Sequence, residues 1–259
     1  MNDIFELHRG TAPLLISLPH NGSDIPAPLA ARMVERARQA PDTDWHVSRL
    51  YAFARELGAS MLVPRHSRYV IDLNRPPDDT SLYPGQNTTG LCPAVQFTGE
   101  PVYLEGQAPS AEEIAARIET YWRPYHEALR DELARIKAAH GRVLLWEGHS
   151  IKGSDLPFLF PGRLSDLNLG TSGGASCSPQ RQASVEGALA AQSQYDYVVN
   201  GRFKGGYITR HYADPANGID AIQLEISQRI YMDEATFAYD ETKAAAAQAV
   251  IRSLLEAAI

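Results

Sequence analysis

The sequence has little cysteine, no long apolar run and no excess of positive charge. Only two of its 259 residues are cysteines, Cys92 and Cys177, and each lies in a turn-like segment, GLCPA or ASCSP. Two separated cysteines do not form a zinc site of clustered thiolates, and a disulfide is not expected in a reducing compartment. We therefore interpret both thiols as structural.

Other absences narrow the class of protein further. No run approaches the roughly 18 apolar residues of a membrane helix. The first ten residues, MNDIFELHRG, lack the basic and apolar segments of a secretory signal. A net charge of −7 argues against a nucleic-acid-binding surface. We therefore expect a cytoplasmic protein that binds neither membranes nor nucleic acids.

What is present is the composition of an ordinary globular protein, 44% hydrophobic and 21% charged. The chain shows no internal repeat, low-complexity tract or linker, so we expect a single domain over residues 1–259. Short apolar runs rich in Val, Ile and Leu are predicted to be strands buried on both faces. These runs span residues 14–18, 59–63, 69–73, 142–146 and 221–226.

Helical patterns separate these runs. Residues 44–57 place their apolar side chains on one stripe. A capping box of Ser110 and Glu113 opens a long helix, in which Pro124 should produce a kink or a break. A last helix begins at about Ala235. The alternation predicts an α/β fold with a mixed, mostly parallel central sheet flanked by helices.

Two long segments, residues 75–109 and 150–178, are crowded with Pro, Gly, Asn and Ser. Structureless loops of such length are uncommon inside a compact domain and are often functional. Each begins just after a predicted strand, and ligands of α/β folds bind at that edge of the sheet. We expect a site there.

Two histidines follow predicted strands directly, His20 in LLISLPH and His149 in VLLWEGH. If these strands are neighbours, both imidazoles lie at one edge of the sheet. That arrangement suits zinc, which takes three protein ligands and a water in catalytic sites. The alternative is that each histidine is a hydrogen-bonded turn residue.

A third ligand should be a carboxylate or another histidine. The candidates are Asp24, four residues after His20, and Asp42, Asp44 and His46 in the segment DTDWH. Because that segment opens a predicted helix, one of its two aspartates could instead be the helix N-cap.

Two glutamates lie in predicted strands. Glu147 should share a face with His149, two residues on, and could orient a histidine. Glu225 lies in AIQLEISQR, where a buried carboxylate is costly unless it is paired or functional. Beside a metal-bound water it would act as a general base. The alternative is an edge strand with a hydrated polar face.

Cations gather in two segments of this acidic chain, and arginine binds carboxylates bidentately. Their concentration near the expected metal site suggests an anionic substrate. No phosphate-binding loop or nucleophile-elbow motif is present. The cations are Arg65, Arg68 and Arg75 in PRHSRYVIDLNRPP, and Arg202, Lys204 and Arg210 in NGRFKGGYITRH.

With these residues in place, the chain resembles the N-formylglutamate amidohydrolases, also called N-formylglutamate deformylases. The resemblance covers nearly the whole chain in order, and the long loops match best. The matching segments are LLISLPHNG, DTDWHVSRLY, SRYVIDLNRPPDD, LYPGQNTTGLCP, YWRPYH, LLWEGHSI, DLNLGTSGGASC, VVNGRFKGGYITRHY and AIQLEISQRIYM.

This family is similar in turn to zinc carboxypeptidases and aspartoacylases, so the resemblance implies a carboxypeptidase-like fold and site. It implies that His20 and His149 hold zinc or another divalent metal ion. It also implies that Asn74 and Arg75 bind the α-carboxylate of the substrate, and that Glu225 is the base.

One departure from the wider group concerns its His-x-x-Glu pair, because Ser23 stands three residues after His20. We therefore take Asp44 as the acidic ligand, with Asp24 and His46 as alternates. The remaining cations, Arg68, Arg202, Lys204 and Arg210, are the candidates for binding a side-chain carboxylate.

The resemblance implies metal-dependent hydrolysis of N-formyl-L-glutamate to formate and L-glutamate, a step of histidine degradation. Two alternatives are a metal amidase for another N-acyl acidic amino acid and a non-catalytic protein that binds anionic metabolites.

Overall fold

The structure, a computed structural model, describes residues 4–154 and 156–259. The strands found there are β1 (Phe5–His8), β2 (Leu14–Ser17), β3 (Ser60–Pro64), β4 (Val143–Ile151), β5 (Leu167–Gly170), β6 (Tyr197–Val199) and β7 (Ile219–Ser227).

Within these described residues, the strands form a seven-stranded sheet in the order β1-β3-β2-β4-β7-β5-β6. The four central strands, β3, β2, β4 and β7, run parallel to one another. β1 and β5 run antiparallel to their inner neighbours, and β6 is parallel to β5. The predicted α/β fold with a mixed, mostly parallel sheet is therefore confirmed.

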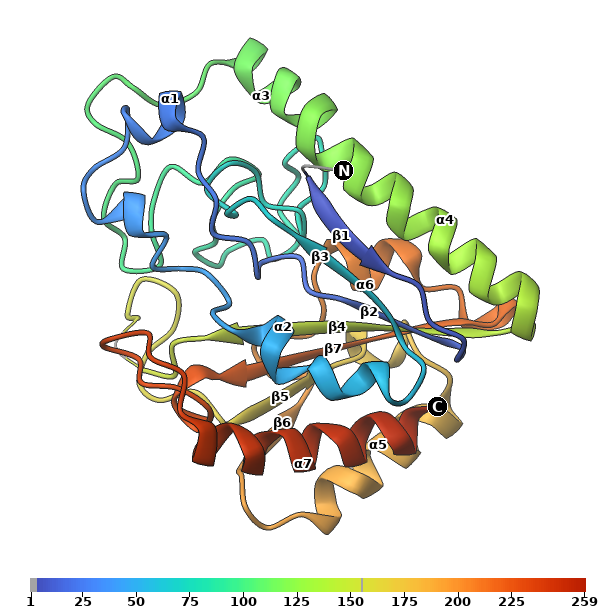
Figure 1. Ribbon diagram of the computed structural model, residues 1–259. Helices are drawn as coiled ribbons and strands as arrows, with labels where there is room; N and C mark the ends of the chain where they lie inside the picture. The colour runs from blue at the N-terminus through green and yellow to red at the C-terminus, as the bar shows by residue number, and fades with distance from the viewer. Residues whose placement is uncertain (1–3, 155) are drawn as a thin grey trace.

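Helices cover both faces of the sheet, with α4 along one face and α5 and α7 along the other (Figure 1). The helices are α1 (Ala27–Ala30), α2 (Val47–Leu50), α3 (Ala111–Arg117), α4 (Arg123–His140), α5 (Pro179–Ala191), α6 (Tyr207–Tyr212) and α7 (Glu241–Ala258). Shorter turns are η1 (Ala37–Gln39), η2 (Ala52–Arg55), the π-helical η3 (Ile118–Trp122), η4 (Ser172–Gly174), η5 (Pro215–Asn217) and η6 (Gln228–Ile230).

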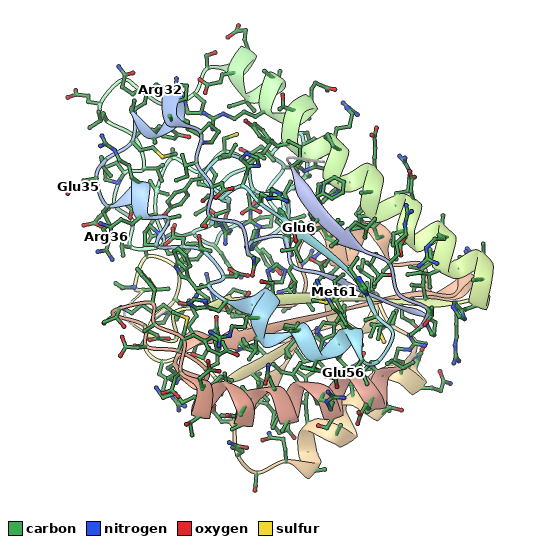
Figure 2. The ribbon with its side chains drawn as sticks, viewed as in Figure 1. Glu6, Arg32, Glu35, Arg36, Glu56 and Met61 are labelled. Carbon is green, nitrogen blue, oxygen red and sulfur yellow. The ribbon has the colours of Figure 1, made fainter. Side chains whose placement is uncertain are left out.

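The period-two alternation of the strands divides the apolar side chains between two cores. Leu14 and Ile16 of β2 belong to the core under α2, α5 and α7, whereas Leu15 belongs to the core under α4 and α6. Met61 of β3 is buried in the first core, while Glu56, just after η2, is exposed on the outside (Figure 2). The central strands are thus apolar on both faces, as the sequence runs predict.

Four of the five predicted strands exist, but the prediction of a strand over residues 69–73 is wrong. This segment forms turns after β3. Its apolar side chains pack in two directions, with Tyr69 beside Leu29 and Ile71 in the core under α4. A short buried apolar run has no periodicity that separates a strand from a packed loop, and here the loop packs against the core under α4 and against a separate small cluster around Leu29.

The predicted helices are present with shifted bounds. Residues 44–57 form only α2 and η2, and the last helix begins at Glu241 rather than about Ala235, because the side chain of Asp240 caps it. The Ser110 side chain caps α3 as expected, whereas the Glu113 carboxylate of the predicted capping box pairs with Arg32 and Arg117. The helix is not broken at Pro124, because the π-helical turn η3 joins α3 directly to α4, whose second residue is this proline. The proline is accommodated by this local change of helix type.

The carboxyl ends of the central parallel strands share one edge, toward which the arrowhead of β7 points at the left of Figure 1. The loops that follow β2, β3 and β4 therefore converge there. None of the helices in the described residues is long and apolar enough to cross a membrane.

Candidate metal and substrate site

Three side chains from separate segments meet at this edge of the sheet. One possible ligand atom each from His20, Asp44 and His149 lies within 4.8 Å of the others, and all three residues are buried. The Asp44 Oδ2 atom lies 3.2 Å from His149 Nδ1 and 3.8 Å from His20 Nδ1. Ligands of a tetrahedral zinc ion are separated by about 3.3 Å, so small side-chain adjustments would complete the coordination geometry.

Backbone pairing explains why these residues meet. The strands β2 and β4 are parallel neighbours, so the histidines that follow β2 and occupy β4 reach the same edge. The backbone N–H of Asp44 donates to the carbonyl of His20 at 3.0 Å, which holds the second segment against the first. The Asp44 carboxylate in turn accepts the backbone N–H of Ser150 at 3.1 Å.

The structure places the other candidate ligands elsewhere. Asp24 is exposed. The Nε2 atom of His46 hydrogen-bonds the carbonyl of Phe237 at 2.8 Å, and Asp42 accepts the hydroxyl of Tyr69 at 2.6 Å. α2 begins after His46 with no side-chain cap, so neither aspartate is its N-cap.

A buried carboxylate lies behind each histidine. His20 Nε2 donates to Asp72 Oδ1 at 2.7 Å, so Nδ1, the nitrogen nearer Asp44, is the one that carries the lone pair and could bind a metal ion. In this structure Nδ1 lies 3.4 Å from Arg68 Nη1. Glu147 Oε2 lies 3.4 Å from His149 Nε2 and can orient that ring in the same way, as its place on β4 suggested. Sequence reasoning missed Asp72. The available signal was its spacing of four residues from Arg68.

The pKa values of the two histidines are shifted in opposite directions. Burial lowers the pKa of His20, and the Arg68 guanidinium lowers it further. Burial acts against the charge of His149 as well, but its hydrogen bonds with Asp44 and Glu147 outweigh burial and raise its pKa to about 10. A metal ion at this cluster would compete with that proton.

Glu225 lies beside this cluster because of strand register. β4 pairs with β7 so that His149 stands opposite Glu225, and the side chains of opposed residues share a face. The Glu225 side chain is buried, and burial raises its pKa to about 8, although the charge of His149 opposes the shift. β7 is a central strand, so a hydrated edge strand does not explain this carboxyl group.

The loop after β3 carries Asn74 to the same place. Its Oδ1 accepts the backbone N–H of Ile208 at 2.9 Å, and its Nδ2 lies 3.2 Å from His149 Nε2. A Cβ atom on Gly206 would lie 2.3 Å from that Nδ2, so this close approach requires glycine.

Two arginines of this loop also line the site. The buried Arg68 donates to Asp72 at 2.5 Å, and its Nη1 lies 3.4 Å from His20 Nδ1. Arg75 donates from Nε to the carbonyl of Thr89 at 2.9 Å. Both arginines face one pocket together with His20, Asn74 and Glu225.

The three cations of the later segment occupy different positions. Arg202 lines the pocket. Lys204 is exposed and is not among the pocket-lining residues. Arg210, also exposed and outside the pocket lining, donates to the carbonyl of Gly205 at 2.9 Å and lies over the ring of Tyr83.

The pocket contains about 710 Å³ of space when its open mouth is included. It combines a three-residue cluster of metal-ligand type, a buried carboxyl group and several guanidinium groups. The fold and this site define a class of protein. They have the features of a hydrolytic enzyme with an α/β fold, whose pocket suits a small anionic substrate and contains residues that could hold a metal ion.

Comparison with known proteins identifies the family. The family model for N-formylglutamate amidohydrolase matches residues 12–232. The N-formylglutamate deformylase of Pseudomonas aeruginosa is 53% identical over 257 residues, covering 99% of this chain and 96% of the relative. That of Pseudomonas putida is 51% identical over 258 residues, with the same coverage of both chains. The chain belongs to the N-formylglutamate amidohydrolase family.

One solved structure agrees with this assignment, and a second shares only the fold. The crystal structure of N-formylglutamate amidohydrolase from Ralstonia eutropha superposes with a TM-score of 0.85 at 27% identity, covering 98% of this chain and 97% of that one. A protein from Agrobacterium tumefaciens shares the fold, with a TM-score of 0.72 at 18% identity and coverage of 98% and 94%.

Proposed function

We propose that the protein hydrolyses N-formyl-L-glutamate to formate and L-glutamate at a metal centre formed by His20, Asp44 and His149. Family membership supports the substrate and the reaction. The observation that carries the mechanism is the meeting of the three-residue cluster with Glu225 in one pocket. On the resemblance alone, we further propose that the reaction serves histidine degradation.

The donor set suits a divalent ion, with zinc our first choice. Two imidazoles and one carboxylate are a ligand set of catalytic zinc sites, and their ligand atoms lie within 4.8 Å of one another. Asp72 behind His20 and Glu147 behind His149 supply the outer hydrogen bonds that fix such rings. When bound, the ion supplies Lewis acidity toward the formyl oxygen and lowers the pKa of water.

Glu225 serves as the general base. Its carboxylate takes a proton from the attacking water and passes it to the amide nitrogen as the carbon–nitrogen bond breaks. Burial favours the protonated form of this residue, and a neighbouring divalent charge would counteract that effect. Arg68, with Nη1 3.4 Å from His20 Nδ1, is placed to donate to the oxygen that gains negative charge.

Asn74 and Arg75 hold the α-carboxylate. The Oδ1 and Nε atoms of these residues are occupied by Ile208 and Thr89, which fixes both side chains without using the terminal nitrogens of Arg75. A guanidinium held in this way loses little rotamer freedom when it binds a carboxylate. The amide is thereby oriented next to Glu225, which accounts for part of the rate enhancement.

The test is formate release from N-formyl-L-glutamate by the wild-type protein and by Glu225→Gln. The variant should fold and bind the substrate, but it should lose about 100- to 10,000-fold in kcat because the base is gone. If Glu225→Gln released formate as fast as the wild-type protein does, Glu225 would be excluded as the base. A preference of the wild type for N-acetyl-L-glutamate would instead assign a different amidase activity.

A further inference from the structure

We infer that Arg202 binds the side-chain carboxylate of the substrate and thereby selects a dicarboxylic N-formyl amino acid. This inference rests on the proposed function and assigns a second carboxylate subsite within it. The observation is that Arg202 and Arg75 line the pocket and that neither is in an ion pair with a carboxylate of the described residues. Across residues 4–154 and 156–259, neither guanidinium lies within 4 Å of a carboxylate oxygen, whereas Arg68 pairs with Asp72 at 2.5 Å.

The surroundings of Arg202 suit a carboxylate on a short aliphatic chain. Its guanidinium carbon lies 5.6 Å from the ring centroid of Phe160 and 6.0 Å from that of Phe203. Leu159 and Phe203 line the pocket beside it. Apolar walls can enclose the two methylene groups of glutamate, and partial exclusion of water strengthens an ion pair with the half-buried arginine.

The positions of the two arginines decide which carboxylate each one receives. Arg75 directly follows Asn74, whose Nδ2 lies 3.2 Å from His149 in the cluster. The α-carboxylate is closer to the scissile amide than the side-chain carboxylate is, by two methylene groups. Arg75 therefore receives the α-carboxylate, and Arg202, on the separate loop between β6 and α6, receives the other.

The two remaining candidate cations do not fit this role. Lys204 is exposed outside the pocket lining, and the exposed Arg210 is held by Gly205 and Tyr83. Tyr83 itself donates its hydroxyl to the carbonyl of Gly205 at 2.7 Å. Arg210 and Tyr83 thus brace the loop that carries Arg202, while Arg202 alone among these three cations faces the pocket.

The test compares N-formyl-L-glutamate with N-formyl-L-glutamine, which has nearly the same shape but lacks the side-chain charge. Wild-type protein should prefer the glutamate substrate in kcat/KM. Arg202→Met should lower kcat/KM for N-formyl-L-glutamate by about 10- to 100-fold, the usual effect of losing a charged hydrogen-bonded pair. The value for N-formyl-L-glutamine should change less than about threefold, because that substrate never formed the pair.

An equal loss with both substrates would overturn the inference, since it would indicate general damage to the pocket. A selective loss in Lys204→Met rather than in Arg202→Met would also overturn it. Calorimetric binding of L-glutamate and L-glutamine tests the subsite without turnover. Selective loss of L-glutamate affinity in Arg202→Met supports the subsite, even if wild-type protein releases no formate and the proposed function fails.

Discussion

His126 of α4 supports the substrate-binding loop, and this role makes stability depend on pH. Its Nε2 donates to the carbonyl of Leu73 at 2.9 Å, directly before Asn74, and its Nδ1 accepts the hydroxyl of Tyr212 at 2.9 Å. Both nitrogens are thus used by the neutral ring, which also stacks on Trp122. Burial lowers the pKa of His126 to about 3.

The lowered pKa of His126 determines how the stability of the folded protein changes with pH. The unfolded chain binds a proton on this histidine below about pH 6.5, whereas the folded protein binds it only below about pH 3. Because the unfolded state binds more protons in this window, His126 lowers the stability as the pH falls from 6.5 toward 3. At about 1.36 kcal/mol per unit, the cost at pH 5 is about 2 kcal/mol relative to pH 7.5.

The assay is urea unfolding of chelator-treated protein at pH 7.5 and pH 5. His126→Gln keeps a donor for the Leu73 carbonyl but cannot titrate. Between pH 7.5 and pH 5, its free energy of unfolding should therefore fall by about 2 kcal/mol less than that of the wild type. His140→Gln, which removes the exposed histidine at the end of the same helix, is the matched control. Equal pH dependence in wild type and His126→Gln would refute the reasoning.

Two further substitutions test how the site is held together. Asp72→Asn should lower the free energy of unfolding by about 3–5 kcal/mol, because it removes the carboxylate that pairs directly with the buried Arg68. It should also lower metal affinity by about 10- to 100-fold, because the hydrogen bond that orients His20 is weakened. Urea unfolding and zinc calorimetry measure both, and losses no larger than those of Glu56→Gln, which breaks an exposed pair, would contradict this prediction. Gly206→Ala should lower formate release, because the added Cβ would displace Asn74. The control is Gly187→Ala in α5, where the added Cβ meets no atom within 4 Å beyond its chain neighbours and the helix backbone; it should keep the activity and stabilise the helix by about 1 kcal/mol. Equal activities of the two variants would exclude the steric explanation.

The meeting of His20 and His149 could be predicted because it depends on a general property of parallel strands. Each histidine follows or ends an apolar run, and parallel neighbours bring their carboxyl ends to one edge. The opposition of His149 and Glu225 depends on strand order and register, which no short segment encodes. Their placement in one site could be proposed only by resemblance to a family.

The loops were less predictable, because their packing depends on distant partners. Residues 69–73 were expected to form a strand, but the pair of Arg68 with Asp72 and contacts with two cores hold them in turns. Lys204 and Arg202 are two residues apart, yet only Arg202 faces the pocket. Local sequence does not distinguish them, because the loop path is determined by contacts such as that of Tyr83 with Gly205.

The most direct test of the central claim measures formate release and metal content in the same samples. Protein stripped with a chelator should release no formate from N-formyl-L-glutamate, and one equivalent of zinc or another divalent ion per chain should restore activity. Asp44→Asn should bind the ion at least about tenfold more weakly and remain nearly inactive at the same stoichiometry. Full activity of metal-free protein, or full activity with one ion in Asp44→Asn, would contradict a metal centre formed by His20, Asp44 and His149.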